Sequence, residues 1–129
     1  MTIYYALVAK NKNIILADYT EYSGNFQQYT MKLMQRIEPE SKKTFELEEF
    51  LFHYINEEGI TILCMTDKVM VKKVAFAFLQ DLRKTLLNIY TAREIENAKA
   101  YSISTFTENI REKIKYYNNN SHIMNDKTD

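Results

Sequence analysis

The side chains best suited to acid–base or nucleophilic chemistry are His53 and Cys64. His53 lies in the apolar run FLFHYI, without a nucleophile in a recognisable elbow or a glycine-rich loop. Because acid–base catalysis needs a partner group within reach, we interpret His53 as a structural or surface residue. Cys64 follows the apolar run ITIL, which indicates a small core residue rather than a reactive thiol. Two histidines and one cysteine are too few for an obvious zinc site, so the sequence predicts no metal and no cofactor.

Pairs of like charges are the other candidate chemical groups. Glu48–Glu49 and Glu57–Glu58 flank predicted turns, where solvation explains them better than catalysis. Lys42–Lys43 and Lys72–Lys73 have the charge to touch an anionic membrane, but recognisable basic clusters hold about four residues or more. Neither lysine pair alone therefore predicts a membrane site. Without a recognisable set of catalytic groups, the sequence favours binding over catalysis.

The composition is that of one globular domain. The 129 residues are 46% hydrophobic and include only two glycines and one proline, which favours long elements. Seventeen basic and seventeen acidic side chains give a formal net charge of zero, which argues against a nucleic-acid partner. A single cysteine favours a reducing, cytosolic setting. We find no secretory signal and no apolar run of the roughly 18 to 20 residues that span a membrane, so we expect no direct membrane insertion.

Hydrophobic periodicity predicts five strands and three helices. We expect strands over 3–9, 14–19, 43–48, 50–55 and 60–65. The first helix follows the second strand, with a capping box of Asn25 and Gln28. The second helix is capped by Asp67 and runs to about Tyr90. TAREIENAK is a helix end or a loop, and the last helix begins near Ser104.

Each helix carries an apolar stripe that we expect to face the sheet. The first stripe is Phe26, Tyr29, Thr30, Leu33, Met34 and Ile37. The second is Val71, Val74 or Ala75, Phe78, Leu82, Leu86 and Ile89, and the third is Phe106, Ile110, Ile114 and Tyr117. The polar, aperiodic segment that follows is typical of a tail, so we divide the chain into a domain of residues 1–118 and a linker or tail of 119–129.

The strand over 43–48 differs from its neighbours. Phe45 and Leu47 alternate with Glu46 and Glu48, whereas the strands over 3–9 and 60–65 are apolar on both faces. Strands without a polar face are typical of a sheet centre covered by helices on both sides. The alternating strand is therefore expected at an edge, with one face buried and the other in water.

Several motifs, in order, resemble the longin domain of longin-type vesicle SNAREs, and among these the tetanus-insensitive vesicle-associated membrane proteins. The resemblance begins at IYYALVAKNKNIILADY and continues through SGNF and FLFHYI. ILCMTDKVMVKKVAFAFLQDLRKTL, residues 62–86, is its strongest part, and AYSISTF leads into the last helix. It covers about residues 1–118 with nearly the family's spacing. The fold that it implies is profilin-like: a five-stranded antiparallel sheet of order 2-1-5-4-3, with one helix on one face and two on the other.

The resemblance also implies a function without enzyme activity. Longin domains regulate membrane fusion and direct a SNARE to its compartment, on the cytoplasmic face of vesicles or endomembranes. A groove between the first helix and the edge strand binds the SNARE motif of the same protein or, instead, a sorting adaptor. On this sequence we expect the groove to be lined by Leu33, Met34, Ile37, Phe45 and Leu47. The simpler alternative is that Phe45 and Leu47 are only the floor under the first helix.

Two features depart from the family's pattern. The SNARE motif with its central arginine and the membrane anchor are absent from this chain, and Lys43 stands where related strands often carry an apolar residue. A SNARE-free longin-like subunit of a trafficking or adaptor complex is therefore an alternative function. A small enzyme or ligand sensor that uses His53 is a third, and a deep polar pocket around His53 would favour it. For the chain itself we expect a soluble monomer.

Overall fold

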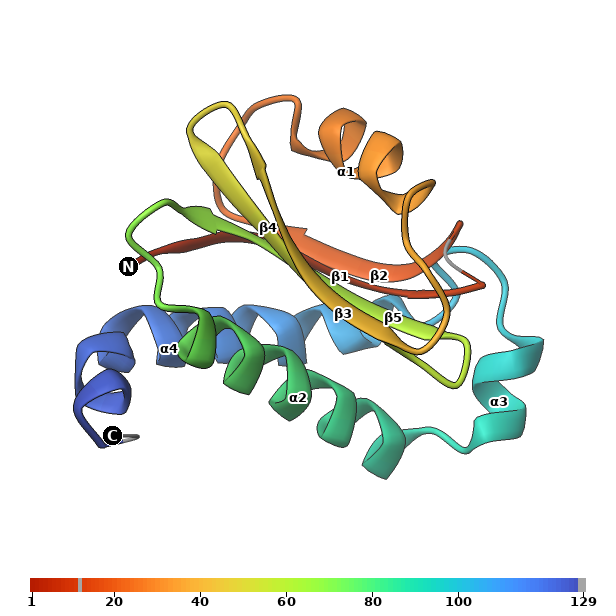
Figure 1. The fold of residues 1–129 in the computed structure, drawn as a ribbon. Helices are drawn as coiled ribbons and strands as arrows, with labels where there is room; N and C mark the ends of the chain where they lie inside the picture. The colour runs from red at the N-terminus through yellow and green to blue at the C-terminus, as the bar shows by residue number, and fades with distance from the viewer. Residues whose placement is uncertain (12, 128–129) are drawn as a thin grey trace.

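The computed structural model describes residues 1–11 and 13–127. They form one antiparallel sheet with helices on both faces (Figure 1). The strands are β1 (Ile3–Lys10), β2 (Ile14–Thr20), β3 (Ser41–Leu47), β4 (Phe50–Glu57) and β5 (Ile60–Asp67). The helices are α1 (Phe26–Met34), α2 (Lys72–Ile89), α3 (Ala92–Asn97), the single 3-10 turn η1 (Ser104–Phe106) and α4 (Thr107–Lys127).

The strand order is β2-β1-β5-β4-β3, which confirms the predicted order. β1 and β5 occupy the centre, as their unbroken apolar sequences indicated, and β2 and β3 are the edges. Successive side chains of a strand point to opposite faces of the sheet. In β1, Ala6 and Val8 belong to the core under α2 and α4, whereas Tyr5 and Leu7 belong to the core under α1.

The face covered by α2 and α4 holds the larger core. Phe78 and Leu82 of α2 and Ile110 of α4 are completely buried there, as predicted, with Phe106 at the end of η1. The rings of Phe78 and Tyr117 meet edge to face, with centroids 5.4 Å apart, and join the two helices. The two helices lie side by side beneath the sheet in Figure 1.

The opposite face is covered by α1 alone, a helix of nine residues. Leu33 and Met34 pack on the sheet, and Ile37 follows in the loop after the helix. Its core on the strands includes Leu7, Phe52, Tyr54, Leu63 and Met65. Because α1 is short, apolar side chains near it are left only partly buried.

Asp67 does not cap α2, contrary to the prediction. It is the last residue of β5, and α2 begins five residues later behind Val71, whose side chain makes no capping hydrogen bond. The Asp67 carboxylate accepts a hydrogen bond from the main-chain nitrogen of Thr2 at 3.0 Å and lies 3.5 Å from the amino group of Met1. It therefore fastens the start of β1 to the end of β5.

Three other details of the helix predictions are wrong. Asn25 stands at the start of α1, but its side chain makes no capping hydrogen bond, so the predicted capping box does not form. α1 also ends at Met34, so Ile37, the last residue of the predicted stripe, lies outside the helix. Ile89, the last residue of the predicted stripe and of α2, is 48% exposed rather than buried against the sheet.

The segment TAREIENAK contains a separate short helix, α3, with a complete capping box. The Thr91 hydroxyl accepts a hydrogen bond from the main-chain nitrogen of Glu94 at 3.1 Å, and the Glu94 carboxylate accepts one from Thr91 at 3.0 Å. α4 then continues to Lys127, through most of the segment predicted as a linker or tail. Asn118 accepts from the main-chain nitrogen of Ile3 at 2.7 Å and donates to its carbonyl at 3.1 Å.

Candidate protein-binding groove

The edge strand β3 places the two apolar residues singled out from the sequence on one face. Phe45 pairs with Phe52 and Leu47 with Phe50 in the antiparallel ladder. Paired residues of neighbouring strands project to the same face, and Phe52 lies in the core under α1. Phe45 and Leu47 are only partly buried at the margin of that core.

The three groove residues predicted on the helix side lie deeper than expected. Leu33 is 6% exposed, Met34 2% and Ile37 3%. They pack against the sheet, so they hold α1 in place rather than offer much surface to a partner. The structure thus puts all five predicted residues in one apolar cluster, but only Phe45 and Leu47 lie at its accessible margin.

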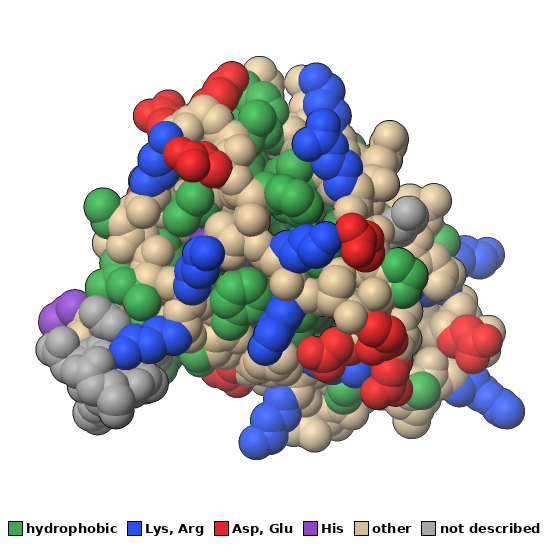
Figure 2. Space-filling model, viewed as in Figure 1, with side chains coloured by type: hydrophobic (Ala, Val, Ile, Leu, Met, Phe, Trp, Pro, Cys, Tyr) green, Lys and Arg blue, Asp and Glu red, His purple; other side chains and the backbone are tan. Residues whose placement is uncertain are grey.

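Aromatic side chains that the sequence analysis did not assign to the groove complete this margin. Phe26 and Phe50 meet edge to face with centroids 6.2 Å apart, and Tyr4 meets Phe50 in the same way at 5.7 Å. Tyr29 of α1 is also partly buried against the cluster. Figure 2 shows apolar side chains in the space between the β3–β4 hairpin and α1.

We call this surface the α1–β3 rim; it consists of Phe26, Tyr29, Phe45, Leu47 and Phe50. The hairpin itself carried a signal for Phe50. A turn of two residues, Glu48 and Glu49, separates Leu47 from Phe50, and such a short hairpin pairs the flanking residues. Paired residues share a face, so Phe50 belongs with Leu47.

The other end of the rim is closed by polar contacts. The Ser41 and Tyr54 hydroxyls are 2.9 Å apart, and Asn56 donates to the carbonyl of Glu38 at 3.0 Å. Lys43, the departure noted in the sequence, donates to the Glu38 carboxylate at 2.7 Å. Because the charge of Lys43 is paired with Glu38 in the α1–β3 loop, it leaves Phe45 in an apolar setting. The Phe45 ring stacks on Tyr54 at a centroid distance of 6.0 Å.

His53 has a structural role, on the opposite face of the sheet from the rim. It is completely buried, with Nδ1 2.9 Å from the Thr44 hydroxyl and Nε2 2.9 Å from the Thr66 hydroxyl. The Thr66 hydroxyl donates its proton to the carbonyl of Asp67, so Nε2 is the donor and Nδ1 the acceptor of a neutral imidazole. Burial, and secondly the nearby charge of Lys72, lowers the pKa of His53 to about 4.

Cys64 is also structural. Its thiol is fully buried in β5, and burial raises its pKa because the thiolate would lose its hydration. A buried thiol that resists ionisation is a poor nucleophile. The prediction of a small core residue is confirmed.

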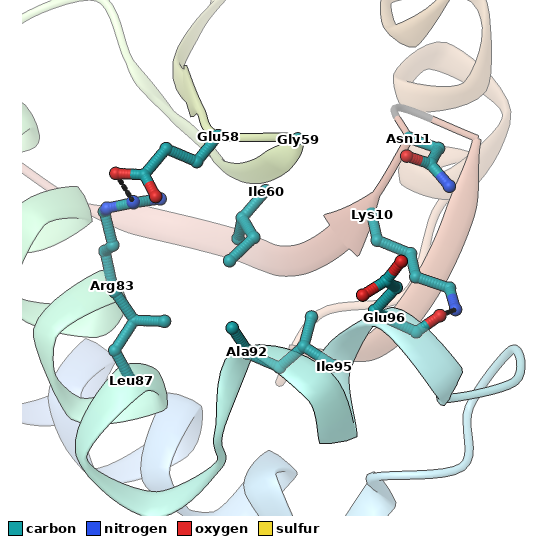
Figure 3. Close-up of a pocket in the computed structure, with 10 residues that line it drawn as sticks. All are labelled: Lys10, Asn11, Glu58, Gly59, Ile60, Arg83, Leu87, Ala92, Ile95 and Glu96. Atoms are coloured by element: carbon teal, nitrogen blue, oxygen red, sulfur yellow. Dashed lines mark hydrogen bonds and ion pairs between the residues drawn. The ribbon is translucent and has the colours of Figure 1, made fainter.

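A separate cavity of about 320 Å³ lies between the turns of the sheet and the ends of α2 and α3 (Figure 3). Two cationic residues, Arg83 and Lys10, line it. Arg83 donates to the carbonyl of Glu57 at 3.0 Å and pairs with the Glu57 and Glu58 carboxylates at 3.3 and 3.7 Å. Lys10 donates to the carbonyl of Glu96 at 2.6 Å. Both cations are held by the protein's own groups, so they fasten α2 and α3 to the sheet.

Comparison with known proteins identifies the fold. The family model for the longin, or regulated-SNARE-like, domain matches residues 16–110. The chain belongs to the longin family. The antiparallel sheet of order β2-β1-β5-β4-β3, with helices on both faces, is the longin fold that the sequence motifs implied.

Vesicle-associated membrane proteins are among the relatives of this longin domain. It is 30% identical to Vesicle-associated membrane protein 7B of Dictyostelium discoideum over 125 residues, 95% of this chain and 47% of that protein. It is 32% identical to Vesicle-associated membrane protein 7 of Mus musculus over 122 residues, 93% of this chain and 54% of that protein. Vesicle-associated membrane protein 711 of Arabidopsis thaliana is 28% identical over 122 residues.

The chain thus spans about half the length of the curated relatives that it matches. Among the helices that the structure describes, none combines the length and apolar character needed to cross a membrane.

Proposed function

We propose that this longin domain is a regulatory and sorting domain of a vesicle SNARE, without enzymatic activity. The α1–β3 rim binds the SNARE motif of the same protein and, in its place, a sorting adaptor. Relatives that are vesicle-associated membrane proteins support the trafficking role. A single surface for both partners makes the two states exclusive, so adaptor binding and release of the SNARE motif are coupled.

The observation that carries the proposal is the difference between the two edges of the sheet. At β2, the carbonyl of Ile15 accepts a hydrogen bond from the main chain of Tyr101 at 2.8 Å, and the carbonyl of Asp18 accepts from the Thr107 hydroxyl at 3.4 Å. At β3, no main-chain hydrogen bond from outside the β3–β4 ladder is found in the described part of the chain. The protein covers one edge with its own segments and leaves the other available.

An open edge beside an apolar rim suits a peptide ligand. The main chain of β3 offers hydrogen-bonding groups to an extended segment, and the rim offers aromatic and aliphatic contacts to its side chains. An amphipathic SNARE helix needs only the second feature, with apolar anchors at helical spacing. Phe45 lies where both features meet, so we assign it as the main anchor.

The test compares Phe45→Ser with a matched control, Phe76→Ser. Both phenylalanines are partly buried near β3, but Phe76 of α2 packs on the opposite face of the sheet. The SNARE motif of the full-length protein, supplied as a separate peptide, is titrated against each variant. We expect Phe45→Ser to weaken binding at least about tenfold, equivalent to about 1.4 kcal/mol, and Phe76→Ser to leave the affinity unchanged.

Circular dichroism and thermal melting separate a lost anchor from a damaged core. If Phe45 is a groove residue, the Phe45→Ser variant should keep its helix content and most of its stability. If Phe45 is instead only the floor under α1, the variant should unfold, because the loss of a buried aromatic side chain costs several kcal/mol. A folded Phe45→Ser variant that binds as tightly as the parent would rule out Phe45 as an anchor, and a parent domain that binds neither the SNARE motif nor an adaptor would reject the function.

A further inference from the structure

The side of β3 that faces away from the rim carries polar side chains, including one lysine. Lys42, Thr44 and Glu46 alternate with the rim residues of β3, so they project toward α2. The ladder agrees, because Lys42 pairs with Ile55 and Thr44 with His53, both on the α2 face. The positive charge of Lys42 therefore lies on the side of β3 away from the rim.

The first turns of α2 form the facing side. Phe76 packs edge to face on His53, with centroids 5.9 Å apart. Lys72 lies four residues before Phe76, on the same side of the helix, and is close enough to His53 to help lower its pKa. Lys73 follows Lys72, and the first turn of α2 has no acidic residue.

The β5–α2 loop completes this surface. The Lys68 ammonium pairs with the Glu46 carboxylate at 2.8 Å, which joins the loop to the end of β3. Val69 is 69% exposed, more than any other large hydrophobic side chain that the structure describes. Lysines therefore flank one protruding aliphatic side chain and one half-buried aromatic ring.

We call this surface the lysine margin; it consists of Lys42, Lys68, Val69, Lys72, Lys73 and Phe76. Figure 2 shows basic side chains around an apolar one between β3 and the start of α2. The two lysine pairs stand about thirty positions apart in the sequence, and each alone is too small to indicate a membrane site. The fold brings four lysines together with one carboxylate, that of Glu46, which pairs with Lys68. Four lysines are the lower limit of recognisable lipid-binding clusters, which hold about four to eight basic residues.

We propose that the lysine margin is a docking surface for an anionic lipid bilayer. The formal net charge of the chain is zero, so attraction to such a bilayer has to come from a local cluster. An exposed valine flanked by lysines favours a bilayer over an acidic peptide, because the headgroup region takes up an apolar tip and basic side chains together.

Docking in this way leaves the α1–β3 rim accessible. Phe45 and Leu47 project from the face of β3 opposite Lys42. A bilayer under the lysine margin therefore faces the start of α2, and α1 points away from it. The domain then presents its partner-binding surface from a fixed orientation at the membrane.

Vesicle flotation tests the proposal with the 129-residue chain. The parent should bind phosphatidylcholine vesicles that contain about one-third phosphatidylserine at low ionic strength, and release them at high salt. Lys42→Gln combined with Lys72→Gln should bind at least about tenfold more weakly. The control, Lys84→Gln with Lys99→Gln, removes the same charge from exposed positions outside the margin and should bind like the parent.

Equal losses in the two double variants would overturn the proposal, because binding would then follow net charge alone. A parent that fails to bind the anionic vesicles would overturn it as well. So would binding of an oligoglutamate peptide at the margin without binding of vesicles, which would indicate a protein partner.

A fluorescence measurement locates the contact. The chain contains no tryptophan, so a single substitution provides a unique reporter. Val69→Trp should shift its emission to shorter wavelength when anionic vesicles are added, and Ile89→Trp, at an exposed position outside the margin, should not. A shift for Ile89→Trp without one for Val69→Trp would place the contact elsewhere and reject the margin. Neither readout involves the rim, so failure here is distinct from failure of the proposed function.

Discussion

The two faces of the sheet are closed to different degrees. Under α2 and α4, large side chains such as Phe78, Leu82 and Phe106 are completely buried, and the helices also pack on each other. The core under α1, a helix of nine residues, is smaller, and the five residues of the α1–β3 rim remain partly buried at its margin. Partly buried side chains also surround the core under α2 and α4, but that core contains more buried residues. Burial of apolar surface is the main source of stability, so the first face carries most of the fold's stability. The second leaves the α1–β3 rim partly buried, and this is the surface at which we propose that a partner binds.

The largest test of this comparison is Phe78→Ala. Phe78 is completely buried and packs on Tyr117 of α4, so its truncation leaves a cavity between two helices. We expect a loss of about 3 to 5 kcal/mol in the free energy of unfolding, measured by chemical denaturation. Phe45→Ser, on the open face, should cost clearly less. A loss below about 1 kcal/mol for Phe78→Ala would contradict the assignment of stability to the α2–α4 face.

Strand patterns predicted the sheet well because each strand's burial is a local property. Unbroken apolar residues placed β1 and β5 in the centre, and the alternation of Phe45 and Leu47 with acids placed β3 at an edge. Helix boundaries were less predictable. Asp67 has the residue type of a helix cap, but it bonds to Thr2 at the other end of the chain, a contact that local sequence does not contain.

The apolar cluster of α1 and β3 was predictable from the sequence, but the depth of its helix residues was not. Helical spacing correctly grouped Leu33 with Met34, but it does not tell how closely α1 approaches the sheet. That distance depends on the side chains that α1 meets across the sheet, and it buries both residues. The place of Phe50 in the rim arises from its pairing with Leu47 across the hairpin, which the pattern of a single strand does not contain.

A second prediction concerns His53, which is buried on the closed face. A histidine whose pKa is lower in the folded state takes up its proton preferentially in the unfolded state. With a folded pKa of about 4 against an ordinary 6.5, its contribution to stability is complete above about pH 6.5 and is lost as the pH falls toward 4. The loss between pH 7 and pH 5 should be about 2 kcal/mol.

Denaturation at the two pH values, for the parent and for His53→Gln, measures this contribution. The variant removes the titrating group, so its stability should change less between pH 7 and pH 5 than that of the parent. Carboxylates with lowered pKa, such as Glu38 and Glu46, lose their contribution mainly below about pH 4.5. An equal pH dependence in parent and variant would show that His53 does not charge on unfolding in this range.

The smallest expected effect tests where the closed face ends along α4. Asn118 makes two hydrogen bonds to the main chain of Ile3, which is completely buried. Asn118→Ala leaves both groups without this partner and should cost about 1 to 2 kcal/mol.

Ser121, one turn later, makes a single long contact of 3.4 Å to the carbonyl of Met1. Ser121→Ala should change the stability by less than about 0.5 kcal/mol, because alanine favours the helix as the weak contact is lost. Chemical denaturation of both variants decides between two boundaries. If Asn118→Ala causes a large loss of stability and Ser121→Ala does not, the domain ends near residue 118. The part of α4 after that residue then adds little stability. An equal loss for Ser121→Ala would move the boundary further along α4.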